Sequence, residues 1–148
     1  MPRPPRIAVR AVIVHDDRLL LVNAYPGRTD LWCAPGGGVE AHASLPDNLR
    51  RELHEETGLD VTVGAICLLN EFHDKERDFH QIDIYFRCTV DQTAIAADWT
   101  DPEGVVTHHQ WVTRAELARM RVKPDALAGV AWGDGDAIAY DPLEPILR

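Results

Sequence analysis

The alternation of apolar and polar residues predicts the first strands of this chain. Residues 7–14 alternate and are rich in Val and Ile, which is typical of a strand. After a short polar break, residues 19–22 form a continuous apolar run, so the two segments are expected to pair as a hairpin with a well-buried second strand. Residues 61–69 and 79–90 are predicted as two further strands, with the polar stretch 73–78 as the tip of their hairpin.

One long helix is predicted over residues 45–57, because leucine recurs every fourth residue and marks an inward-facing stripe. Ser44 precedes this segment as a good N-cap, and Pro46 is tolerated in the first helical turn. Gly58 is the expected C-terminal stop, since glycine readily adopts the left-handed conformation that ends many helices.

The second half of the chain is predicted to contain shorter elements. Residues 91–106 form an acidic loop, and residues 106–112 form a short strand after it. A capping box at residues 113–116 opens a second helix, and residues 123–131 form a short third helix. The tail is expected to be irregular because of its glycines and prolines, which are Gly133, Gly135, Pro142 and Pro145. Residues 23–34 are expected to form a loop, and residues 35–38 a glycine corner.

The length and charge of the chain narrow its possible partners. A chain of 148 residues is expected to form a single domain, here residues 1–148. The net charge of −9, from 15 basic and 24 acidic residues, argues against binding to nucleic-acid backbones or to anionic membranes. The same charge is compatible with a phosphorylated small molecule that a cation brings to the protein.

The cysteines and the N-terminus predict a cytoplasmic protein. Cys33, Cys67 and Cys88 are isolated, and without a Cys-x-x-Cys pair they indicate neither a zinc site nor a disulfide framework. No apolar run approaches the length of a membrane span. The basic N-terminus makes a poor signal peptide, because Arg10 interrupts the apolar stretch that follows it.

Three glutamates near the end of the long helix are the main sign of chemistry. At about 100° per residue, Glu56 falls between Leu45 and Leu49 on the helical wheel, and Glu52 lies beside Leu45, with Glu55 one step further round. Like charges four residues apart repel one another, and burying an unpaired carboxylate is costly. A compensating cation is therefore expected, and an oxygen-seeking divalent metal is the natural candidate.

This segment resembles the Nudix box, a signature of glycine, five residues, glutamate, seven residues, and then Arg-Glu-apolar-any-Glu-Glu-any-Gly-apolar. Residues 37–59 match it at eight of nine defined positions, which are Gly37, Arg51, Glu52, Leu53, Glu55, Glu56, Gly58 and Leu59. The mismatch is Ala43, where the signature has glutamate. The order of the flanking elements is also similar to that of the Nudix superfamily, so the resemblance implies an α/β/α sandwich around a mixed β-sheet.

The resemblance also implies an activity, namely Mg²⁺-dependent hydrolysis of a nucleoside diphosphate linked to another group X. In this picture Glu52, Glu55 and Glu56 hold one or more Mg²⁺ or Mn²⁺ ions, which neutralise the diphosphate and activate a water. The carbonyl of Gly36 is the matching position for a further metal ligand. Arg51 is expected to pair with a glutamate and fix its orientation, although an ordinary surface pair with Glu55 has the same spacing.

Two features of the expected site differ between members of the family or depart from its pattern. In the family, the glutamate that Ala43 replaces helps to organise the site, so its loss is expected to weaken the support of Arg51 and Glu52, for which Glu40 or Asp47 could substitute. The general base varies, and here it is either a box glutamate or an acid of a later loop, for which Glu103 is the candidate. The alternative for Glu103 is an ordinary residue of an acidic loop.

The residues around the glycine corner are candidates for binding the substrate. Trp32 precedes the corner, and its ring could stack on a base, although tryptophans are core residues by default. Tyr25 and Arg28 lie in the same loop, and an arginine can grip phosphate bidentately. Arg10 is a further phosphate candidate on the first strand, and Gly37 in the corner completes the set.

Two rival hypotheses belong to other classes. The first is a catalytically weak or inactive Nudix-type domain that senses a nucleotide, which Ala43 favours and the intact glutamates disfavour. The second is an interaction domain with a charged helix, for which Mg²⁺ has no effect on thermal unfolding. A homodimer is expected only by analogy with the family. The sequence leaves the nucleotide and the group X open.

Overall fold

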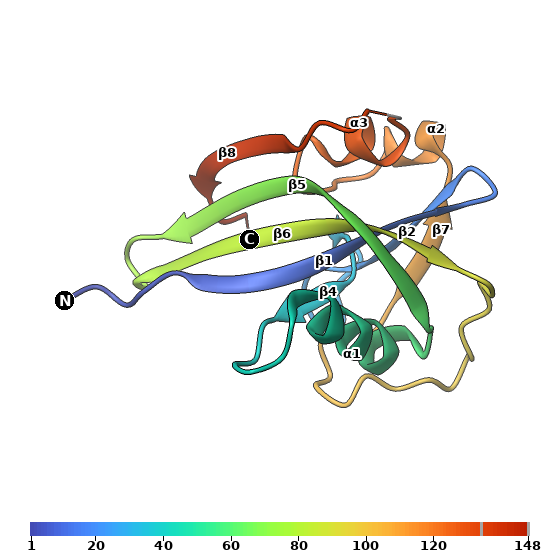
Figure 1. The fold of residues 1–148 in the computed structure, drawn as a ribbon, viewed down its shortest axis with the longest axis horizontal. Helices are drawn as coiled ribbons and strands as arrows, with labels where there is room; N and C mark the ends of the chain where they lie inside the picture. The colour runs from blue at the N-terminus through green and yellow to red at the C-terminus, as the bar shows by residue number, and fades with distance from the viewer. Residues whose placement is uncertain (134, 148) are drawn as a thin grey trace.

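A mixed β-sheet organises the chain, and its strands come from both ends of the sequence (Figure 1). The structure is a computed structural model that describes residues 1–133 and 135–147. The strands are β1 (Arg6–His15), β2 (Arg18–Asn23), β3 (Trp32–Cys33), β4 (Gly36–Gly38), β5 (Val61–Asp74), β6 (Phe79–Val90), β7 (His109–Val112) and β8 (Ala139–Pro145). Within the described residues they form one eight-stranded sheet in the order β3-β2-β1-β6-β5-β8, with β4 on β1 and β7 on β2.

Helices cover both faces of this sheet. They are α1 (Leu45–Thr57), α2 (Arg114–Leu117) and α3 (Leu127–Ala131). Neighbouring residues of β1 face opposite helix layers. Ile13 packs in one core cluster with Leu53 of α1. Val12 packs in the other with Leu117 of α2 and Leu127 of α3. In Figure 1, α1 lies below the strands and α2 and α3 lie above them. The α/β/α sandwich that the resemblance implied is confirmed.

Helix α1 begins and ends where the sequence predicts. The side chain of Ser44 accepts a hydrogen bond from the backbone N–H of Asp47 at 3.1 Å, which satisfies one of the free donors of the first turn. At the other end Gly58 adopts a left-handed conformation with φ 75°, and its N–H donates to the carbonyl of His54 at 2.8 Å. These caps fix which turn of the helix carries the glutamates.

The glycine corner is a short strand that divides the partners of β1. Strand β4 pairs antiparallel with the first half of β1, with Arg10 opposite Gly36, whereas β2 pairs with the end of β1, with Val14 opposite Leu19. A Cβ on Gly36 would lie 2.0 Å from the carbonyl oxygen of Val9, so only glycine fits here. Strand β4 is thereby held between β1 and α1, directly beside the glutamates.

The C-terminal tail corrects the sequence prediction. It was expected to be irregular, but Ala139–Pro145 forms β8, which pairs parallel with β5 through Leu69 and Tyr140. The prolines suggested a loop, but β8 lies at one end of the strand order, and such a strand tolerates residues that cannot donate to a ladder. The backbone N–H of Ile146 then donates to the carbonyl of His73 at 2.9 Å, which anchors the end of the tail.

Several boundaries also differ from the predictions. The strand expected over 106–112 begins at His109, and the helix expected over 123–131 begins at Leu127. Strand β5, expected over 61–69, extends to Asp74 along its antiparallel partner β6. Within the described residues, no helix combines the length and the apolar character needed to cross a membrane.

Candidate metal centre and substrate pocket

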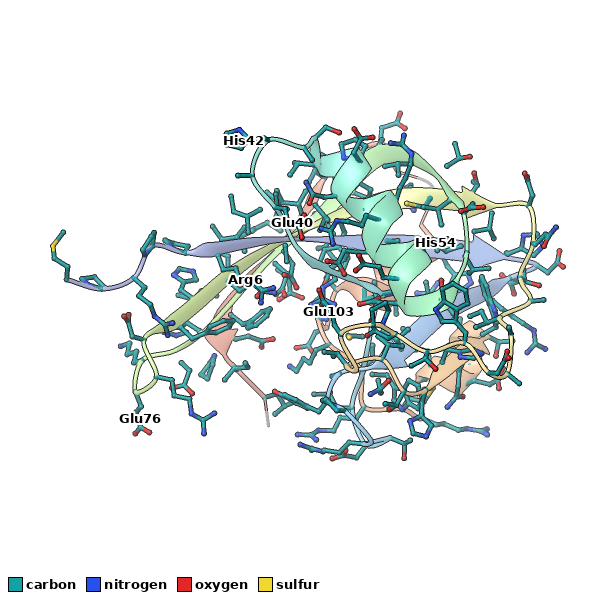
Figure 2. The ribbon with its side chains drawn as sticks, turned by 90° about the horizontal axis from the view of Figure 1, so that it is seen from below. Arg6, Glu40, His42, His54, Glu76 and Glu103 are labelled. Atoms are coloured by element: carbon teal, nitrogen blue, oxygen red, sulfur yellow. The ribbon has the colours of Figure 1, made fainter. Side chains whose placement is uncertain are left out.

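Three glutamates from two segments meet at one point. Glu52 and Glu55 lie on α1, and Glu103 lies on the loop between β6 and β7 (Figure 2). Each offers a carboxylate oxygen, and these oxygens lie within 4.8 Å of one another. Three like charges at this separation repel strongly in a site that is partly buried. A bound cation would offset this repulsion.

The loop that carries Glu103 is docked onto the end of α1. The indole N–H of Trp99 donates to the backbone carbonyl of Glu55 at 2.9 Å, and its ring stands edge-on to the ring of His54, 5.4 Å between centroids. The same ring covers Gly58, where an added Cβ would lie 3.0 Å from it. An aromatic residue four positions before Glu103 thus brings this loop against the helix.

Asp101 sets the shape of the same loop. Its buried carboxylate accepts hydrogen bonds from the backbone N–H groups of Glu103 at 3.0 Å, Val105 at 3.1 Å and Val106 at 2.9 Å. The carbonyl oxygen of the Asn23 side chain accepts two more from the N–H groups that follow, at 2.8 and 2.9 Å. These contacts satisfy the backbone up to the start of β7, which explains why that strand begins late.

Arg51 supports the cluster from the side of α1. Its guanidinium donates to Glu52 at 3.1 Å and to Glu55 at 3.5 Å, so it contacts both helix carboxylates at once. A second nitrogen donates to the side-chain oxygen of Asn48 at 3.0 Å, and Glu40 lies 3.7 Å away as an ion-pair partner. Arg51 therefore holds the glutamates in place instead of forming one isolated surface pair.

The position of the missing signature glutamate, Ala43, is held by backbone contacts. The buried side chain of Asn48 donates to the carbonyls of Ala43 at 3.2 Å, Ser44 at 2.9 Å and Glu40 at 3.3 Å. Asp47, one of the two substitutes considered from sequence, pairs with Arg50 at 2.6 Å on the helix exterior. Glu40, the other, is the acid that reaches Arg51 (Figure 2).

Glu56 lies outside the three-glutamate group and faces the glycine strand. Its carboxylate accepts a hydrogen bond from the backbone N–H of Gly36 at 3.0 Å. Burial raises the pKa of Glu56 from its usual 4.5 to about 8, while the nearby charge of Arg10 opposes the shift. The expectation that Glu56 and the carbonyl of Gly36 bind metal stays a prediction, since the contact between them is through the N–H.

Glu52 is the most deeply buried carboxylate of the cluster. Burial raises its pKa, the charge of Glu103 adds to the shift, and Arg51 opposes it. Gly37 lies against this carboxylate, because a Cβ on Gly37 would come within 2.5 Å of it. The glycine of the box therefore leaves room for the glutamate of the helix.

The donor set fits a hard divalent ion. Magnesium binds oxygens at about 2.0–2.1 Å, so the ligands of one ion are about 3–4 Å apart, close to the spread of the three carboxylates. Magnesium also keeps several waters and uses few protein carboxylates. Glu52, Glu55 and Glu103 provide such a set, with the exposed Glu103 free to adjust.

A pocket of about 330 Å³ opens beside these glutamates. Its volume falls in the range of small-molecule sites. Its walls include the glycine strand, the loop of Glu103 and the last residues of the chain. Its lining includes Arg6, Arg10, Tyr25, Glu56, Asn70, Phe72, Phe79, Gln81, Asp83, Glu103, Lys123 and Glu144.

The structure separates the residues that the sequence proposed for substrate binding. Arg10, Tyr25 and Gly37 line the pocket. Trp32 is 5% exposed and packs in the core, with its indole N–H donating to the carbonyl of Thr29 at 3.1 Å. This burial corrects the expectation that its ring stacks on a base.

Arg28 is also absent from the described lining of the pocket. It pairs with Asp30 at 2.6 Å, and its guanidinium covers the ring of Tyr25 at 4.9 Å from the centroid. The hydroxyl of Tyr25 in turn donates to the carbonyl of Leu147 at 2.5 Å. Arg28 thus supports a pocket residue from behind, which differs from the predicted grip on phosphate.

Sequence reasoning missed Arg6 and the walls made by β5 and β6. Arg6 on β1 lies beside Gln81 on the neighbouring strand β6. Its guanidinium donates to the side-chain oxygen of Gln81 at 3.2 Å. It also lies over Gly38, where a Cβ would meet it at 2.2 Å (Figure 2). The alternation of polar and apolar residues along 79–90 indicates that this strand has a polar face. Which face lines the pocket depends on how the strand pairs with its neighbours.

A mixed sheet between helices, with carboxylates gathered beside a pocket, is the arrangement that the box resemblance implied. A profile of the family described as NUDIX domain matches residues 4–132. The chain belongs to this family. Diphosphoinositol polyphosphate phosphohydrolase 2 of Rattus norvegicus is 33% identical over 98 residues, which cover 65% of this chain and 50% of that protein. The chain thus spans about half the length of the curated relatives it matches.

Solved structures agree on the fold. An ADP-ribose pyrophosphatase from Streptococcus suis 89-1591 superposes with a TM-score of 0.69 at 19% identity, covering 93% of this chain and 100% of that one. A UDP-X diphosphatase superposes with a TM-score of 0.70 at 21% identity, covering 97% of this chain and 69% of that one. Both are similar in architecture to the present chain.

The pKa of Glu56 predicts how the metal-free protein responds to pH. A carboxyl whose pKa is raised by folding binds its proton more tightly in the folded state, so the free energy of unfolding falls as pH rises from about 4.5 to about 8. Glu56→Gln removes this loss, on the order of a few kcal/mol, and keeps an acceptor for the N–H of Gly36. In chelator, the unfolding free energy of the variant should exceed that of the wild type by a margin that grows between pH 5 and pH 9.

Glu76→Gln is the matched control, because Glu76 lies exposed at the hairpin tip, far from the cluster (Figure 2). It should keep the wild-type profile in denaturant titrations at each pH. A constant difference between Glu56→Gln and wild type across this range contradicts the assignment.

Asp101→Ala is expected to loosen the loop that carries Glu103. Hydrogen bonds to a charged acceptor are worth about 1.5–3 kcal/mol, so amide hydrogen exchange at Glu103, Val105 and Val106 should accelerate about tenfold or more. Asp98→Ala, which changes an exposed carboxylate of the same loop, should leave these rates unchanged. Equal rates in Asp101→Ala and wild type, measured by NMR, argue against this role of Asp101.

Proposed function

We propose that this protein is a Mg²⁺-dependent hydrolase that cleaves the diphosphate linkage of a nucleoside diphosphate joined to another group X. The observation that carries the proposal is the meeting of Glu52, Glu55 and Glu103 beside the pocket. Mn²⁺ has the same preference for oxygen ligands and is expected to substitute.

The protein residues would divide the work as follows. Glu52, Glu55 and Glu103 hold the cation, and Arg51 keeps the helix carboxylates oriented. When bound, such an ion would supply charge neutralisation for the diphosphate and would lower the pKa of a water. Attack of a water oxygen on phosphorus would form one P–O bond, the bridging P–O bond would break, and the departing phosphate group would keep the electron pair.

The proton of the attacking water must pass to a carboxylate. The sequence left two sources for this general base, a box glutamate and Glu103. The short distances among the carboxylates of Glu52, Glu55 and Glu103 support either source. Glu103 is the exposed member, and we propose that its second carboxylate oxygen, the one not offered to the cation, is the base because it has the freest access to water.

Arg6 is suited to the far phosphate of the substrate. It lines the pocket beside β4, and within the described residues it has no carboxylate at ion-pair distance. The other two pocket cations are engaged, since Arg10 pairs with Asp83 at 3.4 Å and Lys123 pairs with Glu144 at 3.3 Å. A single unpaired arginine can grip one phosphate bidentately.

The pocket favours a nucleoside over the inositol polyphosphate named for the rat relative. A ring bearing many phosphates needs many unpaired cations, and the described lining offers one in Arg6 together with the carboxylate of Glu103. The aromatic residues Phe72 and Phe79 instead suit a planar base. ADP-ribose and UDP-linked compounds, the substrates named for the structural neighbours, have such bases.

The second candidate function is a sensor that binds the same nucleotides without cleaving them. Ala43 favours it, since the glutamate expected at that position is absent. The contacts of Arg51 with Glu40 and Asn48 disfavour it, because they supply the support that Ala43 removes.

A product-release screen tests the proposal. The purified chain is incubated with ADP-ribose, UDP-sugars, nucleoside triphosphates, dinucleoside polyphosphates and a diphosphoinositol polyphosphate, with Mg²⁺ or with chelator. We expect chelator-sensitive release of a nucleoside monophosphate from at least one nucleotide substrate. Glu52→Gln should lower kcat at least 100-fold, since it removes a charged ligand from the buried side of the centre.

Thermal unfolding separates the alternatives. A metal present at 100 times its Kd stabilises the folded state by about 2.7 kcal/mol, which raises Tm by about 5–10 °C for a chain of this size. Glu76→Gln should keep both the activity and this shift, and Glu52→Gln should lose both. Nucleotide-dependent stabilisation without any product supports the sensor, and full activity in chelator overturns the metal mechanism.

A further inference from the structure

A buried hydrogen-bond donor on the pocket face of β5 has no partner. Asn70 is 4% exposed and lines the pocket, and within the described residues its side-chain Nδ2 donates to nothing. Burying such a donor without an acceptor is costly, and most buried polar groups in proteins are paired. The position is therefore expected to have an acceptor when the pocket is filled.

The neighbouring carboxylates do not supply that acceptor. Asn70 lies opposite Asp83 on β6 and opposite Asp141 on β8. Asp83 accepts from the amide of Gln81 at 2.7 Å and faces the guanidinium of Arg10 at 3.4 Å. Asp141 accepts from the backbone N–H of Ala126 at 2.9 Å. Within the described residues neither carboxylate accepts a hydrogen bond from Nδ2 of Asn70, which leaves this amide for a ligand.

A pair of aromatic rings lies further along the same pocket. Phe72 is two residues further along β5, so it projects from the same face as Asn70. Its ring lies 6.1 Å from that of Phe79, centroid to centroid, with a tilt of 37°, and both residues line the pocket. A pair of rings beside one directed polar group is suited to a planar heteroaromatic ligand.

We propose that Asn70 is the residue that selects the base of the substrate, by donating from Nδ2 to a carbonyl oxygen or a ring nitrogen of a heteroaromatic ring packed against Phe72 and Phe79. This inference rests on the proposed function for the identity of the substrate. The binding step does not depend on catalysis, so it can be tested alone.

The amide of Asn70 can discriminate among bases because it donates a hydrogen bond from a buried position. A site built to donate a hydrogen bond rejects a ring that offers no acceptor there, because the donor is then left buried and unpaired. Rings that present an oxygen or a nitrogen at this point are accepted. Asn70 would therefore set the preference among bases, whereas Arg6 and the glutamates would act on the phosphates that all such substrates share.

The test uses Asn70→Leu, which keeps a similar volume and removes the donor, and Asn70→Ala as a second variant. For the preferred nucleotide substrate, kcat/KM should fall about tenfold or more. For ribose 5-diphosphate, which has the diphosphate but no base, kcat/KM should change less than twofold. The Tm of the ligand-free protein should stay level or rise, because the variant no longer buries an unpaired donor.

Gln92→Leu, which removes an exposed amide elsewhere, is the control.

Binding in chelator separates this inference from the proposed function. Tm shifts are measured with ADP, GDP, CDP and UDP as probes. A shift for at least one of them, lost in both Asn70 variants and kept in Gln92→Leu, supports the role of Asn70 even if no substrate is hydrolysed. Equal losses with and without a base, an unchanged preference among the four nucleotides, or a fall in Tm of both variants that accounts for the loss would overturn it.

Discussion

The repulsion between clustered carboxylates is the constraint on which the rest of this structure depends. Glu52, Glu55 and Glu103 present oxygens within 4.8 Å of one another, and Glu56 lies close by in a position that favours its protonated form. The fold compensates only in part, through Arg51 beside the cluster. Hydrogen bonds and packing hold these charges together, through the caps of α1, the glycine strand against it and the docked loop of Trp99.

The same strand, β1, links this centre to the pocket. Its first half pairs with β4 on one side and with β6 on the other, so the glycine strand and the polar residues of β6 are held on either side of it. Arg10 belongs to this strand, pairs with Asp83 at 3.4 Å and interacts electrostatically with Glu56. The tail then closes the far wall, because β8 and the contact from Tyr25 to Leu147 bring the end of the chain over β5.

Local patterns predicted the elements whose signals are contained within one segment. The leucine stripe, Ser44 and Gly58 defined α1 to the residue, and the capping box at 113–116 correctly placed the start of α2. They failed where a distant partner decides the outcome. The prolines of the tail suggested a loop, whereas β5 offered an edge, and Trp32 looked available for a ligand, whereas the core enclosed it.

The sequence by itself determined the family, the helix and the helix carboxylates, because the Nudix box is a run of neighbouring residues whose spacing is the spacing of the site. Only the tertiary structure decided that Glu103 joins two of them, that Glu40 and Asn48 support Arg51, and that Asn70 faces the pocket without a partner. These facts depend on strand register and on a loop docked by Trp99, which bring together residues far apart in the chain.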